Sequence, residues 1–189
     1  MKGLLFSILL CVFCITTDLK ALPAQVIIIR HAEKPATPEG DSLSTKGRER
    51  AAAMVPYFME TKELITNGTP FAIYATSPSK ANTSRRSIET VTPLAEKLGL
   101  TLKSGFEFDD YKKMVDEIKN DASYHDKTVL ICWEHSHIPE IARAFGALQT
   151  PGRWLNEVFD RDWVISFSKT GRATFQNIPQ RLMYGDTQN

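Results

Sequence analysis

The sequence predicts an α/β fold, a three-layer sandwich with a mostly parallel sheet and a C-terminal antiparallel hairpin. Short apolar runs alternate with amphipathic segments over most of the chain, which is typical of parallel strands joined by helices. Towards the C-terminus the pattern changes to two short apolar runs, residues 163–168 and 172–175, on either side of a polar turn. The 189 residues, 42% of them hydrophobic, show no internal repeat or linker, so one domain is expected.

The first 21 residues are expected to be a secretory signal peptide. A positive start (MK) precedes an apolar run at residues 3–15, and residues 16–21 are polar and end in a small residue. The run is short for a membrane span, and a buried strand or a short membrane anchor is the alternative. A lipoprotein is disfavoured because Cys11 and Cys14 follow large residues. We therefore expect a mature domain at residues 22–189 that is exported and is periplasmic or secreted.

The formal charge argues against an anionic macromolecular partner. The chain has 23 Lys and Arg against 22 Asp and Glu, and removing residues 1–21 brings the two into balance. Because no basic stripe is present, neither nucleic acid nor an anionic membrane is an expected partner, and no stable membrane insertion is expected after signal removal. Cys132 would then be the one remaining cysteine. Within an apolar run it is expected to be a buried core residue, and it has no partner for a disulfide in the mature domain.

The mature domain is expected to begin with a buried strand and a long helix. Residues 25–30 (QVIIIR) are β-branched and continuous, as in a strand that is covered on both faces. After a loop at 35–41, Ser44 can cap a helix at 45–60, which Pro56 should kink or shorten.

The elements after this helix are expected to alternate between strands and helices. Gly99 should end the helix that precedes it. The expected elements are a buried strand at 71–76 (FAIYAT), a helix at 83–98, a weaker strand at 100–108, a short helix at 110–119, the clearest strand at 128–133 (TVLICW) and a helix at 138–147.

Polar side chains follow three of these strands where the strands end. They are Arg30 and His31 after the first strand, Ser77-Pro78 with Arg85 and Arg86 after the second, and Glu134, His135 and His137 after the clearest one. Parallel strands present their carboxyl ends at one edge of a sheet, where ligands bind. An Arg fork matches phosphate oxygens, and a neutral imidazole is a competent nucleophile towards phosphorus. Each feature alone fits a helix cap or a solvated turn, but their joint placement predicts a phosphate site.

Four motifs in the same order resemble those of the histidine phosphatase superfamily, which includes the phosphoglycerate mutases and acid phosphatases. The motifs are Arg30-His31-Ala32-Glu33, residues 43–51 (LSTKGRERA), Ser77-Pro78 followed by residues 86–90 (RSIET), and the strand and turn at residues 129–136. The resemblance covers residues 25–147. It implies a phosphoglycerate mutase-like fold and a histidine phosphatase domain at residues 22–189.

The resemblance also implies a role for each matching residue. His31 would attack the phosphoryl group and become phosphohistidine, which water then hydrolyses. Arg30 and Arg86 would bind the non-bridging oxygens, with Arg85 as the alternative to Arg86, and His135 would bind the same oxygens. The resemblance implies no metal and no cofactor, since the arginines supply the positive charge.

The chain departs from the family pattern in its second histidine motif, where Glu134 stands in place of Gly and a further histidine, His137, follows. The acid that protonates the leaving group is also weakly marked. Family members often place a carboxylate after the third strand, which indicates Asp109, with Glu107 and Asp110 as neighbours. Glu134 is the competing candidate because it adjoins His135, and a helix N-cap is the alternative role for Asp109.

The expected function is therefore hydrolysis of a phosphomonoester, with a small phosphorylated substrate as partner. A phosphoglycerate mutase-type phosphoryl transferase and a non-catalytic phosphate-binding module are the alternatives. Residues 34–42, 61–69 and 149–156 are expected to form the rim of the pocket. The sequence identifies neither the substrate, the signal cleavage site nor the oligomeric state.

Overall fold

The computed structural model describes residues 22–36 and 40–187, so the predicted signal peptide lies outside the described residues. A six-stranded sheet with the strand order β3-β2-β4-β1-β5-β6 forms the middle layer. The strands are β1 (Gln25–Arg30), β2 (Ala72–Thr76), β3 (Lys103–Phe106), β4 (Thr128–Trp133), β5 (Arg161–Phe167) and β6 (Ala173–Pro179). The helices are α1 (Thr45–Glu60), α2 (Arg86–Leu98), α3 (Tyr111–Asn120) and α4 (Ile138–Ala144), with 3-10 turns η1 (Phe108–Asp110) and η2 (Ala122–Tyr124).

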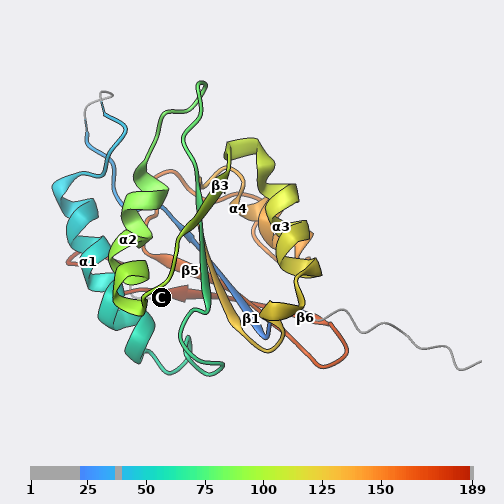
Figure 1. Ribbon diagram of the computed structural model, residues 1–189. Coiled ribbons are helices and arrows are strands. Elements are labelled where there is room, and N and C mark those ends of the chain that lie inside the picture. Colours follow the sequence, from blue (N-terminus) through green and yellow to red (C-terminus); the bar gives the residue numbers. More distant parts are fainter. Residues whose placement is uncertain (1–21, 37–39, 188–189) are drawn as a thin grey trace, which may run out of the picture.

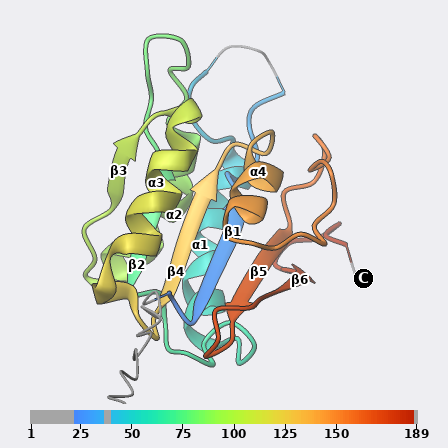
Figure 2. The ribbon, with the colours of Figure 1, turned by 90° about the vertical axis from the view of Figure 1, so that its right-hand side faces the viewer.

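The sheet is parallel over four strands and antiparallel at one side. β1 pairs with β4, β4 with β2 and β2 with β3 in parallel, whereas β5 runs antiparallel to β1 and β6 antiparallel to β5. Helices α1 and α2 cover one face and α3 and α4 the other (Figure 1), and Figure 2 shows α3 and α4 in front of the sheet. The predicted α/β sandwich with a C-terminal hairpin is confirmed.

Two hydrophobic cores lie on the two faces of the sheet. Val26 and Ile28 of β1 pack with residues of α3 and α4, while Ile27 and Ile29 pack with residues of α1 and α2. Every residue of β1 and β4 is buried because helices cover both faces of the parallel strands, which explains their uninterrupted apolar sequences. Cys132 lies fully buried in the second of these cores, as expected for a small core residue.

The observed helices differ from the expected ones mainly at their ends. α1 keeps its full length to Glu60 with Pro56 inside it, so of the two predicted effects, a kink or a shortening, the shortening does not occur. α2 begins at Arg86 rather than 83, because Thr83 instead donates a hydrogen bond to Asp41 in the loop between β1 and α1. Gly99 ends α2 in the left-handed region at φ 66°, as predicted. Within the described part of the chain, no helix is both long and apolar enough to cross a membrane.

Candidate functional site

The predicted site residues come from three elements that end or begin at one edge of the sheet. Arg30 is the last residue of β1 and His31 follows it, His135 lies two residues after the end of β4, and Arg86 is the first residue of α2. β1 and β4 are parallel neighbours, and Arg30 is in register with Trp133. The two histidines therefore lie at the same edge of the sheet although about a hundred residues separate them, as the strand-end argument predicts.

His31 is 1% exposed, and its two ring nitrogens have different surroundings. Nδ1 lies 2.7 Å from the main-chain oxygen of Ala32. Because a carbonyl oxygen can only accept a hydrogen bond, Nδ1 carries the proton in the neutral ring and the lone pair is on Nε2. Nε2 lies 3.5 Å from Oε1 of Glu134. The nitrogen available for nucleophilic attack is thus Nε2.

Glu134 lies between the two histidines. Its Oε1 is 3.5 Å from Nε2 of His31 and its Oε2 is 3.1 Å from Nδ1 of His135. Burial disfavours the charged carboxylate, but contacts with His135 and then His31 outweigh it and hold the pKa of Glu134 well below its usual range. Glu134 is therefore a carboxylate at neutral pH, placed against the proposed nucleophile.

Arg30 is also buried, and main-chain oxygens of one loop hold it in place. Its Nη1 donates to the oxygen of Asn156 at 2.5 Å and to that of Val158 at 3.0 Å. The guanidinium lies 3.9 Å from the ring centre of Phe159, in a cation–π arrangement. Burial lowers the pKa of Arg30 to about 10, with Glu134 opposing the shift and Arg86 adding to it. The side chain remains charged at neutral pH.

Arg86 is half-buried, whereas Arg85 is exposed. Nη2 of Arg86 donates to the main-chain oxygen of Gly40 at 3.0 Å. One turn later, Oγ1 of Thr90 donates to the oxygen of Arg86 at 2.7 Å and accepts from the main-chain nitrogen of Ala32 at 2.9 Å. The four-residue spacing in RSIET therefore ties the start of α2 to the residue next to His31.

Three buried side-chain nitrogens of the predicted phosphate-binding residues have no hydrogen-bond partner among the described residues. They are Nε of Arg30, Nε of Arg86 and Nδ1 of His135, the last of which lies 3.1 Å from Oε2 of Glu134. Buried polar groups without partners are uncommon, because each costs about 1–3 kcal/mol. Three of them, on side chains from separate elements at one edge of the sheet, suit an anion with several oxygen atoms.

A buried ionic network holds the loop that follows β1. Arg50 donates to Glu33, with Nη2 2.8 Å from Oε1, and to Asp186, with Nη2 2.7 Å from Oδ1. Burial opposes the charged form of Glu33, but the hydrogen bond from Arg50 outweighs it and lowers the pKa of Glu33. A Cβ on Gly47 would lie 2.3 Å from the main-chain oxygen of Glu33, so the first turn of α1 approaches this loop as only glycine allows. Glu33 and Gly47 of the motifs therefore have structural roles: Glu33 pairs with Arg50, and Gly47 allows helix α1 to approach the loop after β1.

Asp109 lies apart from this cluster, at the rim. Its side chain is 89% exposed, and its Oδ1 is 3.1 Å from Nε2 of His137, whose ring lies 4.3 Å from that of Phe108. Asp109 borders a cavity of about 400 Å³ between the β2–α2 loop and residues 107–110. It is not an N-cap, since Glu107 caps η1 and Asp110 precedes α3. The structure thus brings Glu134 to His31 and pairs Asp109 with His137.

The loop before β5 contributes contacts that the sequence did not indicate. Oδ1 of Asn156 lies 2.7 Å from Nε2 of His135, and the ring of Phe159 lies 6.1 Å from that of His31. The expected rim at 149–156 includes Asn156. The expected rim at 61–69 is wrong, because Gly68 accepts a hydrogen bond from Thr128 at the opposite end of β4. Helix α1 runs from the edge of the sheet that holds the site to the opposite edge, so residues 61–69, which follow its end, lie far from the site.

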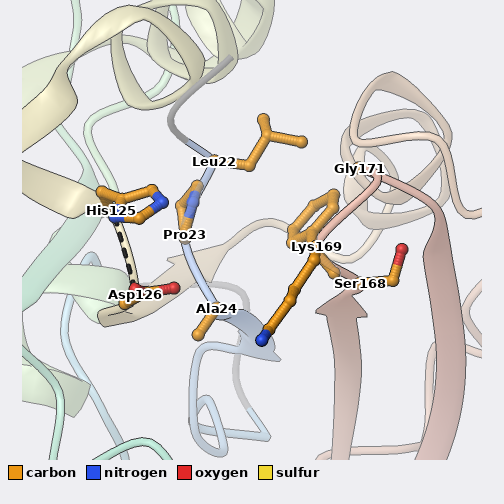
Figure 3. Close-up of a pocket in the computed structure, with 9 residues that line it drawn as sticks. Leu22, Pro23, Ala24, His125, Asp126, Ser168, Lys169 and Gly171 are labelled. Carbon is orange, nitrogen blue, oxygen red and sulfur yellow. Dashed lines mark ion pairs between the residues drawn. The ribbon is translucent and has the colours of Figure 1, made fainter. Parts of the chain in front are cut away.

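A further cavity, of about 310 Å³, lies at that opposite edge (Figure 3). It is lined by residues 22–24, by His125 and Asp126, and by the β5–β6 turn. Nδ1 of His125 lies 3.3 Å from Oδ2 of Asp126, and Figure 3 shows Lys169 on the other side of the cavity. None of the predicted site residues lines it. Among the described residues, no group of three or more His, Cys, Asp or Glu is arranged to hold a metal ion.

Comparison with known proteins gives matches in structure. Neither a family model nor a curated protein matches the sequence. Among solved structures, the protein histidine phosphatase SixA, complexed with tungstate, matches at 14% identity and a TM-score of 0.59, over 82% of this chain and 97% of that one. A mycobacterial glucosyl-3-phosphoglycerate phosphatase matches at 14% identity and a TM-score of 0.53, over 81% and 97%.

A phosphoglycerate mutase from Plasmodium falciparum matches at 16% identity and a TM-score of 0.54, over 84% of this chain and 92% of that one. All three are members of the histidine phosphatase superfamily. The similarity covers nearly the whole length of each of these proteins. The chain has the fold of the histidine phosphatase superfamily.

Proposed function

We propose that this protein is a phosphatase that hydrolyses a phosphomonoester through a phosphohistidine intermediate on His31. The observation that supports it is the set of three buried side-chain nitrogens without hydrogen-bond partners on Arg30, Arg86 and His135, at the same edge of the sheet as His31, whose Nε2 is the nucleophilic nitrogen. The residues with these nitrogens are those that the family resemblance assigns to phosphate binding.

In the first step Nε2 of His31 forms a bond to phosphorus while the bond from phosphorus to the ester oxygen breaks. The leaving oxygen takes a proton from a carboxylic acid. Arg30, Arg86 and His135 stabilise the charge on the three equatorial oxygens. In the second step a water oxygen attacks phosphorus, the P–N bond breaks, and the proton of the water passes to the carboxylate.

Two carboxylates are candidates for the acid, and the leaving group distinguishes them. A good leaving group such as 4-nitrophenolate departs without a proton, whereas an alkoxide requires one. Whichever of Asp109→Asn and Glu134→Gln removes the acid should slow an alkyl phosphate at least about a hundredfold more than 4-nitrophenyl phosphate. The other variant should affect both substrates alike.

The central test is hydrolysis of 4-nitrophenyl phosphate by the purified protein and by His31→Ala. We expect turnover by the wild type and a loss of about a thousandfold or more in the variant, since a covalent nucleophile has been removed. His125→Ala, which changes an exposed histidine at the opposite edge of the sheet, is the matched control. A denaturing quench at alkaline pH, in which the P–N bond survives, should trap phosphate on His31 during turnover.

Thermal melts of both variants show whether the fold is kept. Turnover by His31→Ala above about one percent of the wild type would contradict the nucleophile assignment. A wild type that binds inorganic phosphate without hydrolysing any ester would favour the non-catalytic alternative.

A further inference from the structure

We infer that Asn156 is a positioning residue of the site, holding His135 through its side chain and Arg30 through its main chain. This inference rests on the proposed function of the site. Oδ1 of Asn156 lies 2.7 Å from Nε2 of His135, and the main-chain oxygen of Asn156 accepts from Nη1 of Arg30 at 2.5 Å. One residue of the loop before β5 therefore contacts two of the proposed phosphate-binding side chains.

The side-chain contact determines which edge of the His135 ring faces the phosphoryl group. Nε2 is engaged by Asn156, so Nδ1 is the nitrogen that faces the site, where it is buried without a hydrogen bond. The amide oxygen accepts a hydrogen bond from Nε2, while Nδ1 lies 3.1 Å from Oε2 of Glu134. Asn156 thus fixes the orientation of the His135 ring and leaves Nδ1 on the side of the proposed phosphate site.

The main-chain contact belongs to a loop that has its own anchor. The indole nitrogen of Trp154 donates to the oxygen of Val158 at 2.8 Å, and its ring lies 5.2 Å from that of Trp163 in β5. Val158 also accepts from Arg30. The loop therefore holds Arg30 without help from the Asn156 side chain, and a change of that side chain affects His135 alone.

Substitution of Asn156 should leave the fold intact. The residue is exposed, so Asn156→Ala creates no cavity and keeps the carbonyl that binds Arg30. Asn177→Ala is a matched control, because it also removes an amide oxygen that accepts one hydrogen bond, from Arg161 at 2.9 Å on the β5–β6 hairpin. Its contact lies outside the proposed site.

The experiment is a double-mutant cycle of wild type, Asn156→Ala, His135→Ala and the double variant, assayed with 4-nitrophenyl phosphate. If Asn156 acts through His135, Asn156→Ala should lower kcat/KM about tenfold in the wild type and less than about twofold in His135→Ala. Asn177→Ala should leave kcat/KM unchanged. Equal losses in both backgrounds, or no loss in the wild type, would overturn the inference.

Rescue by a conservative variant gives a second readout that a purely structural role would not move. Asn156→Asp keeps an oxygen acceptor for Nε2 of His135, so it should restore most of the kcat/KM that Asn156→Ala loses. An Asn156→Asp variant as slow as Asn156→Ala would contradict the inference.

Failure of the proposed function can be told apart from failure of this inference. If the wild type does not hydrolyse any ester, the same cycle is measured by calorimetry with inorganic phosphate. A loss of phosphate affinity in Asn156→Ala that vanishes in the His135→Ala background would support the positioning role without catalysis. An equal loss of phosphate affinity in the wild-type and His135→Ala backgrounds would refute the positioning role.

Discussion

The carboxylate of Glu134 lies next to Nε2 of His31, where a phosphoryl group has to bind before reaction. An attacking nitrogen and phosphorus lie about 3–3.5 Å apart before reaction. Oε1 of Glu134 is 3.5 Å from Nε2 of His31, so a phosphoryl group within reach of Nε2 must share this space with a carboxylate. Two negative groups there repel each other, and substrate binding therefore requires Glu134 to turn away or to take up a proton.

This repulsion predicts that Glu134→Gln binds inorganic phosphate more tightly than the wild type. The amide keeps the size of the side chain and removes its charge, so the inhibition constant for phosphate should fall about tenfold at pH 7. Because the pKa of Glu134 is held below its usual range, the carboxylate is charged throughout pH 5.5–7.5, and the difference should persist over that interval. Weaker inhibition of Glu134→Gln would show that the carboxylate assists phosphate binding.

The two neighbouring arginines at the start of α2, Arg85 and Arg86, provide a second test of the proposed phosphate site. Arg86→Lys should weaken both catalysis and phosphate inhibition by about tenfold or more, because an ammonium group does not reproduce the planar fork. Arg85→Lys should change little, because Arg85 is exposed and one helical position rotates a side chain by about 100°. The measurements are kcat, KM and the phosphate inhibition constant. If Arg85→Lys alone reduced catalysis and phosphate inhibition, Arg85 rather than Arg86 would be the phosphate-binding residue.

At the scale of elements, the sequence predicted the strands and their common edge well. The bounds of β1, β4 and α1 agree with the expected ones, because buried parallel strands and a capped helix have strong local patterns. The contacts of Asn156 and Phe159 could not be predicted. They depend on how the loop before β5 folds back over β1, and a loop without regular structure has no periodicity to read.

The approach of α1 to the loop after β1 gives a prediction about Gly47. In Gly47→Ala the new Cβ would meet the main-chain oxygen of Glu33, which cannot move aside as a side-chain end could. We expect a loss of about 1–3 kcal/mol in stability, with a Tm lower by roughly 3–10 °C, and reduced kcat because His31 is two residues from Glu33.

Gly105→Ala in β3 is the control, since a Cβ there meets nothing within 4 Å. Differential scanning calorimetry and a kcat measurement suffice for both variants. An unaltered Tm for Gly47→Ala would mean that α1 can shift away from the loop without cost.

For the whole molecule, the buried carboxyl of Asp162 gives a dependence of stability on pH. Burial raises its pKa to about 6, although hydrogen bonds from Tyr57 and Gln180 oppose the shift. Its folded pKa therefore exceeds the unfolded value of 3.8, so the folded state prefers the protonated form. Asp162 therefore stabilises the folded state most at low pH, and this stabilisation is lost as the pH rises through about 6.

Asp162→Asn should remove this dependence. Between pH 5 and pH 8 the wild type should lose about 1–2 kcal/mol more unfolding free energy than the variant. Glu33 and Asp186 do not contribute in this interval, because their pKa values are lowered and their effect appears at more acidic pH. Urea titrations at the two pH values provide the measurement, and parallel losses in both proteins would contradict the assignment.

The parallel pairing of β1 with β4 also fixes the order in which the chain can become active. Gln25 lies beside Thr128, so forming this pair closes a loop of about a hundred residues and is entropically slow compared with helix formation. Helices α1 and α2 can form earlier, from local sequence. During refolding, far-ultraviolet circular dichroism should therefore recover before turnover does, and the return of activity reports the completion of the central sheet.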